Sequence, residues 1–160
     1  MKSVQIRPPT KDDSNQLSNL MLQLGYTITT EVMCKQIEIY LNSNNYLVYV
    51  AERNSFVIGA ISCAFTDYFH KQGGFARITS LVVDEDYRNQ GVGKGLIRHV
   101  ENCVYKLGYN DIEITTSVHR KSSGTHNFYM SLGYIDIRSE KVYFRKHFDD
   151  CNDDARYIVQ

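Results

Sequence analysis

A chain of 160 residues is about the size of one domain and is long enough to bury a single core. Apolar residues make up 42% and charged residues 22%, with a formal net charge of +0, which excludes a disordered chain and gives no support for a nucleic-acid partner. No apolar run is long enough to cross a membrane, and Cys34, Cys63, Cys103 and Cys151 lack metal-ligand spacing. We therefore expect a cytoplasmic protein with no metal, no nucleic acid and no membrane partner.

The first half of the chain predicts one short strand, two helices and a hairpin. The strand at 4–6 is stopped by Pro8, and the first helix is expected to end at Gly25. Thr10 and Asp13 resemble a capping box before that helix. The residues with helical core spacing are Leu17, Leu20, Met21 and Leu24 in the first helix, and Met33, Ile37, Tyr40 and Leu41 in a second helix that starts near Thr29 or Thr30. Runs of β-branched and aromatic residues at 46–51 and 56–65 predict the antiparallel hairpin.

The second half predicts strands and helices in alternation. A strand at 75–83 follows the turn at Gly73-Gly74, and a strand at about 111–117 carries Ile112, Ile114 and Thr116. A helix between them has Leu96, Ile97, Val100, Cys103, Val104 and Leu107 at core spacing and ends at Gly108. A last helix at 122–132 and two last strands at 134–137 and 142–148 complete the domain. Residues 149–160 are expected to be a solvated tail, so the predicted domain is 1–148.

Three glycines occur within the five positions 91–95, immediately before the third long helix. A P-loop registered on Lys94 would need glycine at 88 and Ser or Thr at 95, where the chain has Arg88 and Gly95. A dinucleotide fingerprint starting at Gly91 would need glycine at 96, where the chain has Leu96. What remains is a helix start with bare amides and two basic side chains, which is typical of a diphosphate site, or a glycine-rich turn that only tightens strand against helix.

Two motifs resemble those of the GNAT N-acetyltransferase superfamily. Residues 88–93, RNQGVG, are similar to the family's Q/R-x-x-G-x-G/A acetyl-CoA signature. Residues 128–134, FYMSLGY, are similar to its FYxxxGF segment, and the resemblance covers roughly residues 3–148. Residues 113–134 further resemble the aminoalkylphosphonate N-acetyltransferase branch.

The resemblance implies an α/β fold with a mixed, largely antiparallel sheet of six to seven strands, splayed central strands and about four helices. It also implies acetyl-CoA as cosubstrate, with the pantetheine arm between the strands at 75–83 and 111–117. The residues implied in binding it are Leu81, Val82, Val83, Arg88, Asn89, Gln90, Gly91, Val92, Gly93 and Lys94. The N–H of Val82 or Val83 would face the acetyl carbonyl.

The expected reaction is transfer of the acetyl group to the primary amine of a small molecule by direct attack on the thioester. By resemblance, Tyr129 is the catalytic acid that protonates the leaving thiolate. The strand at 75–83 lacks the carboxylate that many relatives use as a base. A water ordered by Ser80, or Asp67, His70 or Glu113, remain open as the base, while His119 and His126, which flank the last helix, are expected to be surface or helix-capping residues.

The acceptor and the assembly are left open by the sequence. Tyr26, Tyr68, Phe69 and His70 are expected on the acceptor side, and Arg77 or Arg120 could hold an anionic group. Ser122 and Ser123 stand where the family often has an asparagine that touches the cofactor. A protein N-terminal or lysine acetyltransferase and a catalytically silent acyl-CoA sensor are the alternatives, and a homodimer through C-terminal edge strands is left open.

Overall fold

The structure, a computed structural model, describes residues 3–116 and 124–146 and forms two compact units, 1–117 and 118–160. The strands of the first unit are β1 (Gln5–Arg7), β2 (Tyr46–Arg53), β3 (Phe56–Asp67), β4 (Gly74–Val83) and β5 (Ile112–Ile114). Its helices are η1 (Lys11–Asp13), α1 (Ser14–Leu24), α2 (Thr30–Leu41), η2 (Glu85–Tyr87) and α3 (Val92–Lys106). The described part of the second unit contains α4 (Thr125–Ser131).

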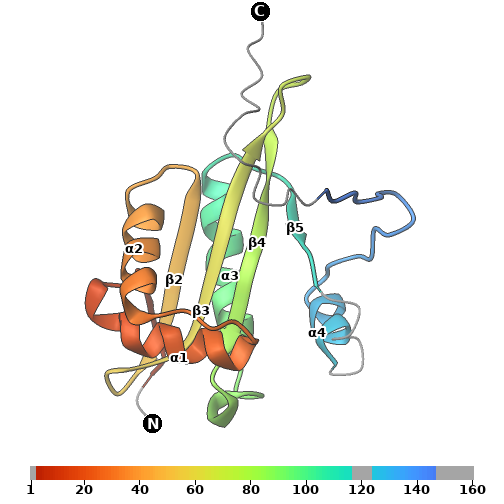
Figure 1. Cartoon of the computed structure of the whole chain (residues 1–160). Helices are drawn as coiled ribbons and strands as arrows, with labels where there is room; N and C mark the ends of the chain where they lie inside the picture. The colour runs from red at the N-terminus through yellow and green to blue at the C-terminus, as the bar shows by residue number, and fades with distance from the viewer. Residues whose placement is uncertain (1–2, 117–123, 147–160) are drawn as a thin grey trace, which may run out of the picture. The chain divides into compact units, whose positions relative to one another are not determined.

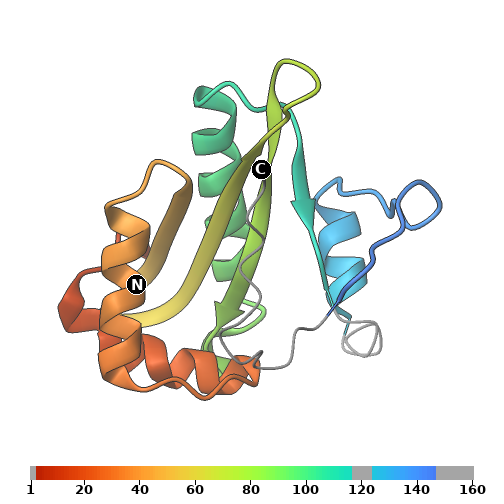
Figure 2. The same cartoon turned by 45° about the horizontal axis from the view of Figure 1, so that its top comes forward.

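The sheet of the first unit has the order β1-β2-β3-β4-β5. Neighbouring strands are antiparallel, except that β5 runs parallel to β4. Helices α1 and α2 cover one face of the sheet and α3 covers the other (Figures 1 and 2). The family-type α/β fold with a mixed sheet is therefore present, but the described residues form five strands rather than six or seven.

The two missing strands are those predicted near the C-terminus. Residues 134–146 are described and contain no strand, so the strand predicted at 134–137 is wrong, as is the part of the last strand that falls at 142–146. The last helix begins at Thr125, and positions 122 and 123 lie outside the described residues. The predicted boundary at 148 and the tail at 149–160 also lie outside them.

The core lies on both faces of the sheet, where the helical periodicities predicted it. Leu17, Leu20, Met33 and Ile37 are buried between α1, α2 and the sheet, and Leu96, Ile97 and Val100 are buried under α3. Two expected core residues are exposed: Leu41 at 48% and Leu107 at 57%. Both stand at the C-terminal ends of their helices, where the apolar face has run past its contact with the sheet. Within the described residues, no helix combines the length and the apolar character needed to span a bilayer.

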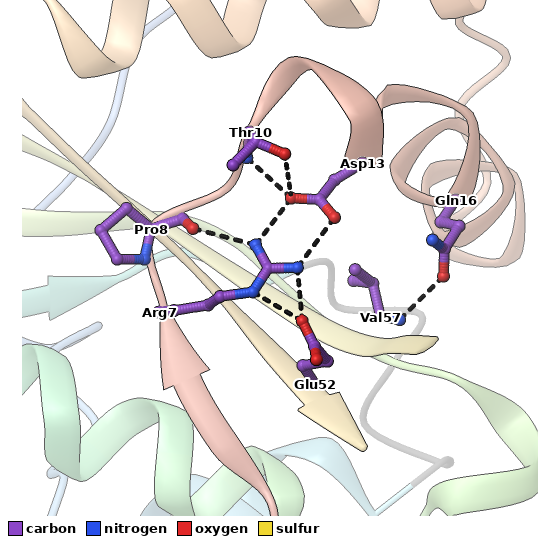
Figure 3. Close-up of polar contacts among 7 residues, drawn as sticks. All are labelled: Arg7, Pro8, Thr10, Asp13, Gln16, Glu52 and Val57. Carbon is purple, nitrogen blue, oxygen red and sulfur yellow. Dashed lines mark hydrogen bonds and ion pairs between the residues drawn. The ribbon is translucent and has the colours of Figure 1, made fainter. Parts of the chain in front are cut away.

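An arginine joins the N-terminal strand to the start of α1 and to β2 (Figure 3). The guanidinium of Arg7 donates to both carboxylate oxygens of Asp13, at 2.8 and 2.9 Å, and to Glu52 at 2.6 Å. The N–H of Thr10 also donates to Asp13 at 2.7 Å, which realises the predicted capping box. On α1, Gln16 accepts a hydrogen bond from the N–H of Val57 in β3 at 2.8 Å. These contacts fix where α1 starts over the sheet.

The Arg7–Asp13 pair generates a stability prediction. We expect Asp13→Asn to lower the free energy of unfolding by about 1–3 kcal/mol, because the guanidinium loses its anionic partner at a position where Asp13 is only 5% exposed. Urea unfolding measures the change. The exposed neighbour Asp12 provides the control, and Asp12→Asn should stay within about 0.5 kcal/mol of the wild type.

The same pair sets the pH dependence of that difference. The hydrogen bond from Arg7 holds the pKa of Asp13 below its usual value, so the stabilisation is complete above about pH 4 and is lost as the pH falls through the lowered pKa. The gap between wild type and Asp13→Asn should therefore shrink in acid. A gap that stays constant down to the acid transition would contradict this assignment.

Candidate functional site

The pairing between β4 and β5 ends partway along β4. The parallel register joins Ala76 to Ile112, Arg77 to Glu113 and Ile78 to Ile114, and β5 stops there. Strand β4 continues to Val83 and remains paired with β3. On the side away from β3, residues 79–83 have no strand partner within 3–116, and this open stretch lies where the resemblance implies that the strands diverge.

The register also decides which backbone groups of β4 face the open side. The N–H of Asp84 donates to the carbonyl of Ile58 at 2.9 Å, so residue 84 points its backbone toward β3. Backbone direction alternates along an antiparallel strand, so Val82 also points toward β3, and Leu81 and Val83 point away. Of the three strand residues predicted to contact the cosubstrate, Leu81 and Val83 therefore present their N–H groups to the open side, whereas Val82 presents a buried side chain to the core.

A bulge lies where the pairing with β5 ends. Ser62 of β3 pairs with Ser80, and the next residue, Cys63, pairs with Ile78, so Thr79 is an extra residue in β4. A bulge of this kind breaks the alternation of side chains. Thr79 and Ser80 consequently share one face, and the hydroxyl of Ser62 lies 2.7 Å from that of Thr79 and 2.6 Å from that of Ser80.

The predicted diphosphate loop follows β4 and η2 and has left-handed backbone at two positions. The φ angle is 60° at Asn89 and 82° at Gly91, the N-cap of α3. The first intrahelical bond runs from the N–H of Gly95 to the carbonyl of Gly91 at 2.9 Å. The amides of residues 92–94 therefore have no acceptor within the helix, and Gly91 lacks a side chain that could supply one. Such a set of oriented amides is suited to an anion.

Neighbouring side chains brace this loop. Arg53, at the end of β2, donates to Gln90 at 2.9 Å, and its guanidinium lies 5.5 Å from the ring centroid of Tyr87. Gln90 in turn donates to the carbonyl of Asp86 at 3.1 Å. Arg88 donates through Nε to the carbonyl of Val83 at 3.1 Å, so the loop is tied to the open edge of β4. The loop is held in place by protein groups alone.

A glycine in β3 lets α3 approach the sheet. A Cβ built on Gly59 would lie 3.1 Å from the carbonyl oxygen of Val82, 3.2 Å from Leu96 and 3.3 Å from Val92. All three distances are shorter than ordinary van der Waals contact. Gly59 therefore sets the position of the first turn of α3, and with it the position of the amides at its start.

A pocket of about 470 Å³ lies on the opposite face of the sheet, under α1 and α2. Its size falls in the range of small-molecule sites. Its lining residues are Leu17, Met21, Tyr26, Ile28, Met33, Gln36, Ile37, Tyr40, Val48, Ala60, Ile61, Ser62, Thr79 and Ser80. The pocket thus reaches the three hydroxyls at the bulge. Of the side chains expected on the acceptor side, Tyr26 lines the pocket, and Tyr68, Phe69 and His70 do not.

The candidate bases differ in their distance from the bulge. Asp67 pairs with Gly74, five residues before Thr79, which corresponds to about 16 Å of strand, and His70 lies in the adjoining turn. Asp67 also accepts a hydrogen bond from Tyr109 at 2.8 Å. Glu113 is closer, but its carboxylate accepts from Arg77 at 2.9 Å. Ser80 stands at the bulge itself, so it is the only one of these groups located directly where pairing with β5 ends.

Tyr129 belongs to the second unit, where it lies on α4 and is half-buried. Its ring centroid is 5.2 Å from that of Phe128 and 6.0 Å from that of Tyr134. Its role as an acid stays a prediction. His126 lies in the first turn of the same helix and is half-buried, and His119, Arg120, Ser122 and Ser123 lie outside the described residues.

Sequence reasoning identified the loop and the open strand but missed the paired hydroxyls of Ser62 and Thr79. The alternating pattern of β4 places Thr79 and Ser80 on opposite faces, and only the register reveals the bulge that brings them together. Arg53 was also missed, since it lies 37 positions from the Gln90 that it contacts. No local signal in the sequence connects the two.

Comparison with known proteins agrees with this geometry. Residues 44–136 match the family model described as an acetyltransferase (GNAT) domain. An uncharacterized N-acetyltransferase from Chlorobaculum tepidum is 36% identical over 104 residues, which cover 64% of this chain and 58% of that protein. An aminoalkylphosphonate N-acetyltransferase from Salmonella typhimurium is 31% identical over 85 residues, which cover 53% of this chain and 54% of that protein. The chain thus matches little more than half the length of these curated relatives.

Solved structures share the fold at low sequence identity. An aminoglycoside N-acetyltransferase in complex with CoA aligns with a TM-score of 0.78 and 19% identity, covering 92% of this chain and 97% of that one. At this level of identity the similarity concerns the fold alone.

The contact at Gly59 generates a paired prediction. We expect Gly59→Ala to lower the free energy of unfolding by about 1–3 kcal/mol, because the new methyl group meets Val82, Leu96 and Val92. Gly95→Ala is the matched change on α3, where the nearest atom to the new Cβ is 3.7 Å away, on Ile6. It should raise stability by about 0.5–1 kcal/mol through helix propensity. Thermal unfolding of the two variants compares them, and equal effects would rule out close approach at Gly59.

Proposed function

Because the chain belongs to the GNAT acetyltransferase family, we propose that it transfers the acetyl group of acetyl-CoA to the primary amine of a small molecule. The observation that carries the proposal is the continuity between the open edge of β4 and the left-handed loop at the start of α3. The amide-rich pantetheine arm of acetyl-CoA would lie along the open edge of β4, and its diphosphate would lie on the loop at the start of α3.

The residues present suit such a cosubstrate. The amides of residues 92–94 have no acceptor in α3, Arg88 and Lys94 add positive charge, and residues 88–95 include no acid. In the preceding turn, the carboxylate of Asp84 is engaged with protein groups, since it accepts from Gln23 at 3.0 Å and from the N–H of Asp86 at 3.0 Å. On the open edge, Leu81 and Val83 would bond the pantetheine amides much as an added strand does.

The proposed reaction needs one stabilised oxyanion and two proton movements. The amine nitrogen attacks the thioester carbon, and an N–H at the open edge of β4 would stabilise the developing oxyanion by about 2.7–4 kcal/mol. Of the two N–H groups considered, that of Val83 faces the open side, whereas that of Val82 faces β3. The C–S bond then breaks, and the thiolate takes a proton from Tyr129, which is our proposed acid. A water held by Ser80 is our preferred route for the proton that leaves the amine.

We also propose that the protein is cytoplasmic. The described cysteines, Cys34, Cys63 and Cys103, are free thiols, which supports a reducing compartment such as the cytoplasm.

A silent acyl-CoA sensor is the alternative favoured by one specific observation, since β4 carries no carboxylate. CoA binding without release of thiol would identify the sensor.

The diphosphate loop is tested by a charge change at Gly91. We expect Gly91→Asp to weaken CoA binding about 100-fold or more, because its carboxylate would occupy the space next to the unpaired amides. Gly91→Asn is the matched control, since Asn has the same shape and tolerates the left-handed backbone equally well. Gly91→Asn should lower the affinity for CoA less than about tenfold. Calorimetric titration with CoA measures both, and wild-type affinity in a folded Gly91→Asp variant would refute the loop.

The acid is tested by Tyr129→Phe. We expect kcat to fall about 10²-fold with little change in CoA affinity, because the ring remains and only the proton donor is removed. Tyr105→Phe removes a hydroxyl from an exposed tyrosine on α3 and should leave kcat unchanged. Thiol release measures kcat in both variants. An unchanged kcat in Tyr129→Phe would remove Tyr129 from the mechanism.

A further inference from the structure

The walls of the pocket under α1 and α2 are mainly apolar. Leu17, Met21, Met33 and Ile37 form its helical side, and Val48 and Ala60 contribute from the sheet. Gln36 supplies the one amide side chain in the lining. Within the part of the chain that the structure describes, no acidic or basic side chain lines it. A charge placed against these walls would lose its hydration without gaining a partner, which is strongly unfavourable.

Of the two arginines considered for an anionic acceptor, Arg77 is engaged elsewhere and Arg120 lies outside the described residues. Arg77 bonds Glu113 at 2.9 Å, and its guanidinium lies 5.1 Å from the ring centroid of Phe75. It is absent from the lining of the pocket. A phosphonate or carboxylate bound under α1 and α2 would therefore find no positively charged side chain among the described lining residues.

Polar groups are concentrated at the floor of the pocket. Ser62, Thr79 and Ser80 are linked by two hydrogen bonds, of 2.7 and 2.6 Å. Each hydroxyl has one proton to donate and two lone pairs to accept with. After the two internal bonds are made, the cluster keeps more acceptor capacity than donor capacity. Such a cluster suits the N–H groups of an amine better than the oxygens of an anion.

The floor also lies beside the start of the open stretch of β4. Thr79 directly follows Ile78, the last residue of β4 that pairs with β5, and Leu81 lies two positions further on. An amine nitrogen bonded to the hydroxyl cluster would therefore lie beside the strand segment along which the thioester is proposed to lie. The hydrocarbon part of the same molecule would fill the space under α1 and α2.

We propose that the acceptor is a hydrocarbon-rich primary amine, aromatic or branched aliphatic, whose only charge is its ammonium group. The inference rests on the proposed function and names the substrate class of the same site. The ammonium loses one proton to water, its nitrogen forms the amide bond to the acetyl carbon, and the C–S bond breaks. The bonded nitrogen then releases its second proton, the departing thiolate takes up one proton, and the products are a neutral amide and the thiol of CoA.

The test compares amines that differ in charge. Thiol release from acetyl-CoA is followed with 2-phenylethylamine, with phenylalanine, which adds a carboxylate to the same skeleton, with 2-aminoethylphosphonate and with the aminoglycoside kanamycin. We expect kcat/KM for 2-phenylethylamine to exceed each of the others about 100-fold, because the pocket offers no partner for a second charge. Calorimetry with CoA-loaded protein should detect binding of 2-phenylethylamine in the absence of turnover.

A matched pair of variants tests the pocket itself. Met21 lines the pocket and is half-buried, so Met21→Arg should lower kcat/KM for 2-phenylethylamine about tenfold or more. The ratio of kcat/KM for 2-phenylethylamine to kcat/KM for phenylalanine should also decrease. Leu22→Arg places the same charge one residue along α1, at a position that is 61% exposed and outside the lining. Leu22→Arg should change neither kcat/KM for 2-phenylethylamine nor its ratio to the value for phenylalanine. Both variants should bind CoA with the affinity of the wild type.

The outcomes separate the two proposals. The substrate class would be overturned if the protein bound CoA and its kcat/KM for phenylalanine, 2-aminoethylphosphonate or kanamycin equalled that for 2-phenylethylamine. The proposed acetyltransferase activity would then still stand. Equal effects of Met21→Arg and Leu22→Arg would overturn the pocket assignment. CoA binding with neither thiol release nor heat from 2-phenylethylamine would also overturn the inference. Failure to bind CoA at all would remove the proposed function and this inference with it.

Discussion

Within the described residues, strand β4 has a partner strand on one side only beyond Ile78, because β5 ends at Ile114 while β4 continues to Val83. Backbone N–H and C=O groups need partners, and a strand edge left open in the middle of a sheet is a place where another chain of amides can bind. The hydroxyl floor of the pocket begins at the same point, and the glycine loop begins where the open stretch ends. One change in pairing therefore gives the site its location.

The two faces of the sheet are then specialised by different devices. On the α3 face, Gly59 permits the close approach of helix to strand, so the first turn of α3 is held tightly against β3 and β4. On the other face, the bulge at Thr79 turns a second hydroxyl toward α1 and α2. A rigid anion-binding helix start and a polar floor to an apolar pocket are thus both consequences of the backbone, with few charged side chains involved.

Much of this follows from the sequence because its causes are local. The spacing of Leu17, Leu20 and Leu24 and the glycine at 25, whose φ is 100°, fix α1 without reference to the rest of the chain. The bulge depends on the register that pairs Ser62 with Ser80, 18 positions further along the chain, and alternation cannot detect this register. The apolar residues at 134–137 satisfy the same local rules as a strand, but a strand also needs a partner edge, and local pattern contains no information about one.

The outer strands of the described sheet are both very short. β1 covers Gln5–Arg7 and β5 covers Ile112–Ile114, so each edge offers only a few backbone groups to a neighbouring molecule. Short edges are one way in which proteins resist joining sheet to sheet into polymers. On β1, the salt-bridged Arg7 adds a charge that an incoming strand would have to accommodate. The longest strand, β3, is enclosed between β2 and β4, which keeps its backbone away from other copies of the chain.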